Sequence, residues 1–203
     1  MKVLKSLLLT IALLFLLGFC WLVGGGFNAA ADAPHSKAVY WLLDTARERS
    51  IAVRAAGVSV PPLGDPAQIA RGAAEYAEMC EGCHRAPGQP VDEEFIGGLY
   101  PRPPDLSKAA ARDPAQVFWA VKHGVKMSAM PAWGLSHDDA TLWAIVAFTQ
   151  KLPSFDADEY KALTQHAAEA HAAAHDAAHD ATGDSTESAH AAPTAHSEMH
   201  PSD

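Results

Sequence analysis

The chain of 203 residues begins with a long apolar block. No charged residue occurs over residues 7–23, and Lys2 and Lys5 precede this run. The 21 residues from Val3 to Val23 would form a helix about 31 Å long, which matches the hydrocarbon core of a bilayer. We therefore predict a single-pass transmembrane anchor over residues 1–26, with the two lysines on the cytoplasmic side and the rest of the chain exported.

A cleaved signal peptide is the alternative interpretation of this block. Ala29, Ala30 and Ala31 resemble a cleavage site, but the apolar run is longer than the roughly 7–15 residues usual for a signal peptide. Cys20 lies within the run and follows the bulky Phe19, whereas a lipidation cysteine would follow a small residue. A membrane-buried thiol is therefore the expected state of Cys20, and both interpretations export the remaining chain.

Residues 27–64 are predicted to form an amphipathic helix and a linker. Ser36 is a suitable N-cap, and apolar residues then recur at helical spacing. These residues are Val39, Leu42, Leu43, Ala46 and Val53, with Arg47, Arg49 and Arg54 expected on the other side. The apolar face should pack on the following domain or rest near the membrane surface, and residues 58–63 should be an extended connector.

Residues 65–153 are predicted to form a compact all-α domain. Asp65-Pro66 and Asp113-Pro114 are each typical of a helix start, with an N-cap followed by proline at the first helical position. A third helix should start within residues 136–139 and end before Pro153. No strand-like alternation is present. About 90 residues make a small core, to which a buried prosthetic group would add apolar mass.

Residues 154–203 have a different composition. Alanine-rich sequence up to about residue 182 favours helix, and the polar residues 183–203 are expected to be disordered. The net charge of the chain is −9, and residues 166–203 contain seven acidic groups and neither lysine nor arginine. A basic surface for nucleic acid is therefore not expected.

The strongest chemical signal is the sequence C-x-x-C-H at residues 80–84. Cys80 and Cys83 are spaced to fit one helical turn, where each thiol can add to one vinyl group of a haem, and His84 can then bind the iron. The motif is typical of c-type haem attachment. A zinc site is disfavoured because no second C-x-x-C supplies the remaining ligands, and a thioredoxin-like centre would require a βαβ context.

A second axial ligand is expected downstream of the motif. Met130 precedes Pro131 in a loop between two predicted helices, and a neutral thioether binds ferrous iron well. Met127 lies three residues earlier and is the main alternative, and His123 is a further one. A loop methionine can also simply fill an apolar gap.

Together, residues 80–84, the loop Met130-Pro131-Ala132-Trp133 and the flanking helices resemble a class I c-type cytochrome. The resemblance covers residues 65–153, and the Pro-rich residues 100–106 and residues 28–40 also resemble membrane-anchored monohaem cytochromes of proteobacteria. It implies an all-α class I cytochrome c fold around one covalently bound haem c. It also implies that Gly72 and Tyr76 pack against the last helix near Trp143.

The resemblance further implies that a proline carbonyl accepts a hydrogen bond from the proximal histidine, with Pro87 and Pro101 as candidates. Arg102, Trp119 and Trp133 are candidates for hydrogen bonds to the haem propionates or for packing against the haem, because arginine and indole N–H groups suit a carboxylate. A surface arginine and core tryptophans are the alternative interpretation.

Histidines are concentrated at the end of the chain. Seven of the eleven histidines lie in the last 38 residues. Among them, His171, His175 and His179 follow i, i+4, i+8 spacing, which puts them on one face of a helix. Such a face can bind Cu²⁺, Zn²⁺ or Ni²⁺, and the alternative is a soluble spacer.

These observations predict an electron-transfer protein rather than an enzyme. The protein would carry single electrons between respiratory or dehydrogenase partners at the inner membrane. It would be anchored by one transmembrane helix, with the haem domain in the periplasm, and it could be a subunit of an oxidoreductase complex. Two alternatives remain: haem-linked metal handling through the histidine-rich tail, and a haem sensor or peroxidase with a labile methionine ligand.

Overall fold

The structure is a computed structural model that describes residues 2–166. The described residues are helical and contain no strand, which confirms the predicted all-α class. In chain order the helices are α1 (Lys2–Val23), α2 (Lys37–Ala55), α3 (Pro66–Met79), α4 (Glu81–His84), α5 (Glu93–Gly97), α6 (Pro114–His123) and α7 (Asp139–Lys151). Short 3-10 turns occur at η1 (Trp133–Leu135) and η2 (Leu152–Ser154), and residues 157–166 are again helical.

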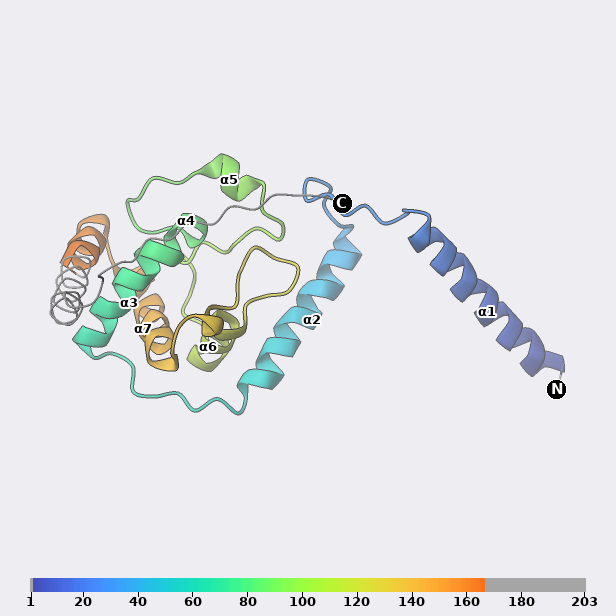
Figure 1. The fold of residues 1–203 in the computed structure, drawn as a ribbon, viewed down its shortest axis with the longest axis horizontal. Coiled ribbons are helices and arrows are strands. Elements are labelled where there is room, and N and C mark those ends of the chain that lie inside the picture. Colours follow the sequence, from blue (N-terminus) through green and yellow to red (C-terminus); the bar gives the residue numbers. More distant parts are fainter. Residues whose placement is uncertain (1, 167–203) are drawn as a thin grey trace, which may run out of the picture.

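Helix α1 projects away from the rest of the chain and buries none of its residues (Figure 1). It is long and apolar enough to cross a membrane, as predicted from the sequence. Signal sequences near an N-terminus share these properties. The helix therefore agrees with both interpretations of the apolar block.

Capping residues mark the helix starts largely as predicted. The side chain of Asp113 accepts hydrogen bonds from the Ala115 and Gln116 amides, and Asp138 accepts one from Thr141. Asp65 precedes Pro66 at the start of α3, but its side chain makes no capping hydrogen bond. Helix α6 ends at Gly124, where φ is +66°, a conformation that glycine adopts readily.

Of the two placements predicted for the apolar face of α2, packing on the domain is wrong, because a different face of the helix packs there. Ser36 caps it as expected, but the buried residues are Ile51 and Ala55, on the side toward α6. Arg47 lies on the packed side, where it pairs with Asp44 and Glu48, and Glu48 also faces Arg112 at 3.7 Å. The predicted apolar face at Val39, Leu42, Leu43, Ala46 and Val53 is exposed.

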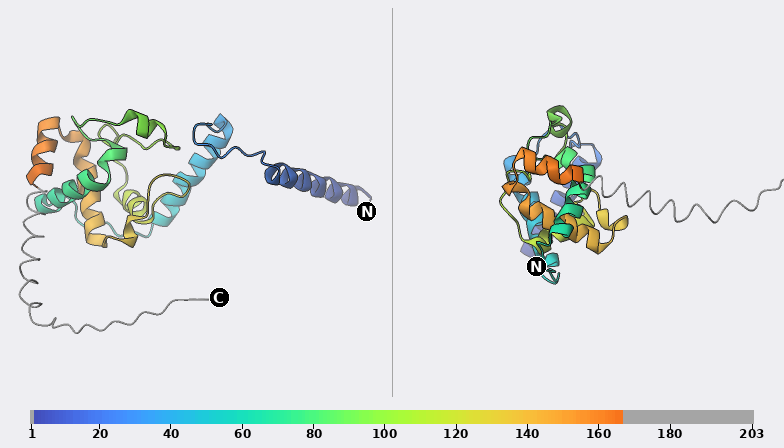
Figure 2. Two further views of the ribbon diagram at one scale, coloured as in Figure 1. Left: turned by 45° about the horizontal axis from the view of Figure 1, so that its top comes forward. Right: turned by 90° about the vertical axis from the view of Figure 1, so that its left-hand side faces the viewer.

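The centre of the fold is the crossing of α3 and α7, which appear side by side in both figures of the fold (Figures 1 and 2). Gly72 faces the backbone of Ala144, and the rings of Tyr76 and Phe148 are 5.2 Å apart. The predicted packing of Gly72 and Tyr76 on the last helix is confirmed, but their neighbours there are Ala144 and Phe148 rather than Trp143. Trp143 lies about 100° around α7 from Ala144. Its ring stacks on that of Phe118, with ring centroids 4.1 Å apart.

Two buried clusters lie against α7. The Tyr76 cluster comprises Ala73, Tyr76, Ala86, Phe148, Leu152 and Tyr160. The Leu142 cluster comprises Phe118, Val121, Leu142, Ile145 and Val146. Cys80 packs against both clusters. The core continues beyond residue 153, because Tyr160 is only 1% exposed.

Candidate functional site

The C-x-x-C-H motif occupies the junction between α3 and α4. Helix α3 ends at Met79, the amide of the following Cys80 donates to the Tyr76 carbonyl, and α4 continues for a single turn. The amides of Cys83 and His84 both donate to the Cys80 carbonyl, at 3.1 and 2.8 Å. Cys80 and Cys83 thus lie in one turn of helix, the arrangement that two-point attachment to a haem edge requires.

The environment of Cys80 favours an uncharged sulfur. Burial, together with the neighbouring Cys83 and Glu75, raises the pKa of the Cys80 thiol to about 12. Thiol redox centres and zinc sites instead use thiolates, whose formation a low pKa assists. A thioether sulfur carries no charge, so this buried position suits a thioether better than either thiolate alternative.

His84 is oriented by a backbone carbonyl. Its Nδ1 lies 3.0 Å from the carbonyl oxygen of Pro104, and because a carbonyl only accepts, Nδ1 must donate. The neutral ring then carries its lone pair on Nε2, the atom that can bind a metal. Burial lowers the pKa of His84 and the hydrogen bond to Pro104 opposes this shift. The net lowering favours the neutral ring.

The predictions of Pro87 or Pro101 as the hydrogen-bond partner of His84 are wrong. The Leu106 amide donates to the His84 carbonyl at 3.0 Å, and this contact brings residues 104–106 alongside the motif. Pro104 is therefore the proline whose carbonyl reaches the imidazole.

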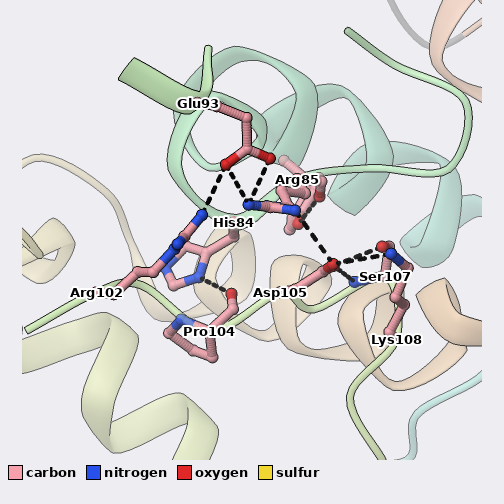
Figure 3. A network of polar contacts seen from close by, with 9 residues as sticks. His84, Arg85, Glu93, Arg102, Pro104, Asp105, Ser107 and Lys108 are labelled. Carbon is pink, nitrogen blue, oxygen red and sulfur yellow. Dashed lines mark hydrogen bonds and ion pairs between the residues drawn. The ribbon is translucent and has the colours of Figure 1, made fainter. Parts of the chain in front are cut away.

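A polar network surrounds this loop (Figure 3). One guanidinium nitrogen of Arg85 lies 2.8 Å from Glu93 Oε1, and its other terminal nitrogen lies 3.8 Å from Asp105 Oδ2. Burial opposes ionisation of Asp105, but hydrogen bonds from Ser107 and the charges of Lys108 and Arg85 together lower its pKa. Arg85 thus links α5 to the loop that carries Pro104.

Two tyrosines reinforce the motif from the Tyr76 cluster. The Tyr76 hydroxyl donates to the Arg85 carbonyl at 2.5 Å, at a residue whose φ of +65° is unusual for arginine. The Tyr160 hydroxyl donates to Glu81 within the motif at 2.6 Å. Burial raises the pKa of both phenols, so they remain protonated donors at neutral pH. Sequence reasoning missed both contacts, because the first depends on the backbone path just after the motif and the second joins segments 79 residues apart.

Arg85→Lys is expected to loosen the Pro104 loop. A lysine has one nitrogen, so it cannot contact Glu93 and Asp105 together as Arg85 does. Much of the network is exposed, so we expect a loss of only about 1 kcal/mol in the free energy of unfolding of the haem-loaded protein. Faster hydrogen exchange at the Leu106 amide should accompany it.

Lys108→Gln is the matched control for Arg85→Lys. Lys108 contacts Asp105 at 3.6 Å from a side chain that is 79% exposed, so its removal should change the free energy of unfolding by less than about 0.5 kcal/mol. Equal exchange rates at Leu106 in both variants would contradict the linking role of Arg85.

The methionine loop is held close to the end of α6. The Val125 amide donates to the Met130 carbonyl at 3.2 Å, and the Met130 amide donates to Ser128 Oγ at 3.2 Å. A Cβ at Gly124 would lie 2.8 Å from the Met130 carbonyl oxygen and 2.7 Å from the Pro131 carbonyl carbon. A glycine at position 124 is therefore required for this close approach.

The two candidate methionines differ sharply in exposure. Met127 is 90% exposed and has φ of +55°, whereas Met130 is partly buried against the Leu142 cluster. Cys80 packs against the same cluster. The loop thus brings Met130, and not Met127, to the apolar surface that the haem-attachment motif also contacts.

The other candidate residues contact different partners. Arg102 pairs with Glu93 at 2.7 Å, as Figure 3 shows. Trp133 packs against the Leu142 cluster, and Trp119 lies beside His123, with ring centroids 4.8 Å apart. The proposed tail site, His171, His175 and His179, lies outside the described residues. Within the described part of the chain, no group of three or more metal-binding side chains is found.

Comparison with known families agrees with this geometry. Residues 67–148 match the family described as cytochrome C oxidase, cbb3-type, subunit III. The match runs from α3 into α7 and includes the C-x-x-C-H motif and Met130. No curated protein and no solved structure matches the chain significantly. The chain thus carries a class I c-type cytochrome domain, a family of electron-transfer proteins whose cofactor is haem c.

Proposed function

We propose that the protein is a membrane-anchored monohaem cytochrome that carries single electrons between redox partners at the membrane. One observation carries the proposal: Cys80 of the attachment motif and Met130 pack against the same buried cluster. A haem bound at Cys80 and Cys83 would therefore lie between the His84 side of the motif and the methionine loop.

The residues at this position fit a covalent haem c. Cys80 and Cys83 would form the two thioethers, and His84 Nε2 and the Met130 sulfur would be the axial ligands. The bound haem supplies one-electron chemistry at its iron. The chain orients the neutral histidine through Pro104 and keeps the methionine loop in place through Gly124, and the apolar Leu142 cluster would cover one side of a bound haem.

Two axial side chains leave no open coordination position for a substrate, which favours electron transfer over catalysis. Arg102, Trp119 and Trp133 remain candidates for contacts with the haem propionates or with the haem itself. Arg102 lies in the loop that carries Pro104, and Trp133 follows Met130 closely along the chain. Helix α1 would anchor the domain beside membrane donors and acceptors, on the periplasmic face of an inner membrane.

An absorbance measurement on the purified holoprotein tests the proposal. We expect a pyridine haemochrome spectrum of the c type, one haem per chain, and haem that acidified acetone does not extract. Carbon monoxide and cyanide should bind slowly or not at all, because both axial positions are filled. Rapid binding of either ligand would instead support a sensor or peroxidase, and extractable haem would contradict attachment through Cys80 and Cys83.

A further inference from the structure

The N-terminal half of α2 presents an apolar surface that nothing in the described structure covers. Val39, Leu42 and Leu43 are 43%, 59% and 51% exposed. Val39, Leu42, Leu43 and Ala46 share one helix face by their i, i+3, i+4 and i+7 spacing. We call these four residues the α2 stripe. Its opposite side already packs on α6 through Ile51 and Ala55.

The acidic residues of α2 lie on the side that packs on the domain, and two of its arginines lie on the exposed side. Both acidic residues, Asp44 and Glu48, pair with Arg47, and Glu48 also faces Arg112 of the domain. Arg49 and Arg54 are exposed, and their spacing from the stripe residues places them on its two flanks. An apolar stripe bordered by arginines complements a lipid surface with anionic headgroups, since arginine can bury its stem and keep its charge in water.

The stripe also lies close to the end of α1. Phe27 is four residues beyond Val23, and its ring is 6.2 Å from that of His35. The His35 amide donates to the Tyr100 hydroxyl at 3.1 Å, and the two rings are 5.3 Å apart. Four residues span at most about 14 Å. The cytochrome domain is therefore held within a few residues of the apolar helix, and α2 lies on the side of the domain toward α1 (Figures 1 and 2).

We propose that the α2 stripe lies in the headgroup region of the bilayer that α1 crosses, in contact with phospholipid. The inference rests on the membrane anchor of the proposed function. The domain would then contact the membrane in one fixed orientation, instead of moving freely on a flexible linker. The same haem edge would therefore always face a membrane partner.

Spin labels in the full-length holoprotein, reconstituted into vesicles of phosphatidylcholine and phosphatidylglycerol, test this contact. One sample carries the label at the native Cys20. Two others carry Cys20→Ala together with either Ala46→Cys in the stripe or Ala67→Cys at the start of α3. Both alanines are exposed on helices, and α3 lies on the far side of the domain from α2 (Figure 1). Collision rates with lipid-soluble oxygen and with a water-soluble nickel chelate are measured for each label.

We expect the labels at positions 20 and 46 to collide preferentially with oxygen, and the label at position 67 to collide preferentially with the nickel chelate. Lipid exposure at position 20 with water exposure at position 46 would overturn the stripe contact and leave the anchor intact. Water exposure at position 20 would overturn the anchor itself. An immobilised label at position 46 that neither reagent reaches would show that protein covers the stripe, which also overturns the lipid contact.

Discussion

Met130→Ala is expected to abolish the sulfur-to-iron charge-transfer band of the oxidised protein. The neutral thioether stabilises ferrous iron, so its loss should lower the reduction potential by on the order of 0.2 V, within the roughly 0.8 V range that axial ligands control. The vacated position should also bind carbon monoxide. Absorbance spectra and a potentiometric titration of the holoprotein measure these changes.

Met127→Ala is the matched control. Both variants remove one thioether from the same loop, but Met127 is 90% exposed and Met130 packs against the Leu142 cluster. The control should keep the band and a potential close to that of the unaltered protein. Loss of the band in Met127→Ala with its retention in Met130→Ala would mean that the loop reorganises when haem binds.

Much of the domain could be predicted because its signals are local. The caps at Ser36, Asp113 and Asp138 act within one turn of the residues they stabilise. The apolar residues of α7 and the glycine–aromatic spacing of α3 also predict which helices pack together. Such features depend on a few neighbouring residues, which a single sequence contains in full.

The contacts that could not be predicted depend on the paths of loops. The identity of Pro104 follows from the pairing of Leu106 with His84, which no local pattern encodes. Likewise, Tyr160 reaches Glu81 across 79 residues. For the apolar face of α2, the sequence left two placements open, on the domain or near the membrane surface, for a different reason. Helical periodicity finds an apolar stripe but does not say whether protein or lipid covers it.

Gly72→Ala is expected to be strongly destabilising, because it adds a methyl group where α3 crosses α7. A Cβ at this position would overlap the carbonyl group of Ala144 and lie 2.9 Å from Phe148 Cβ. Alanine favours a helix over glycine by up to about 1 kcal/mol, whereas overpacking a core costs about 1–3 kcal/mol and sometimes more. A backbone carbonyl cannot rotate away as a side chain can, so α3 and α7 must separate. We therefore expect a net loss of about 2 kcal/mol or more.

Gly57→Ala separates the effect of crowding at Gly72 from the general effect of replacing glycine. A Cβ at Gly57 meets no atom within 4 Å, so this variant should change the free energy of unfolding by less than about 1 kcal/mol, in the stabilising direction. Denaturant unfolding of both holoproteins in detergent measures the difference.

Separation of α3 from α7 also moves Tyr76, which supports the Arg85 carbonyl next to His84. Gly72→Ala should therefore disturb the haem spectrum before unfolding, whereas equal stability of the two variants would contradict the close crossing.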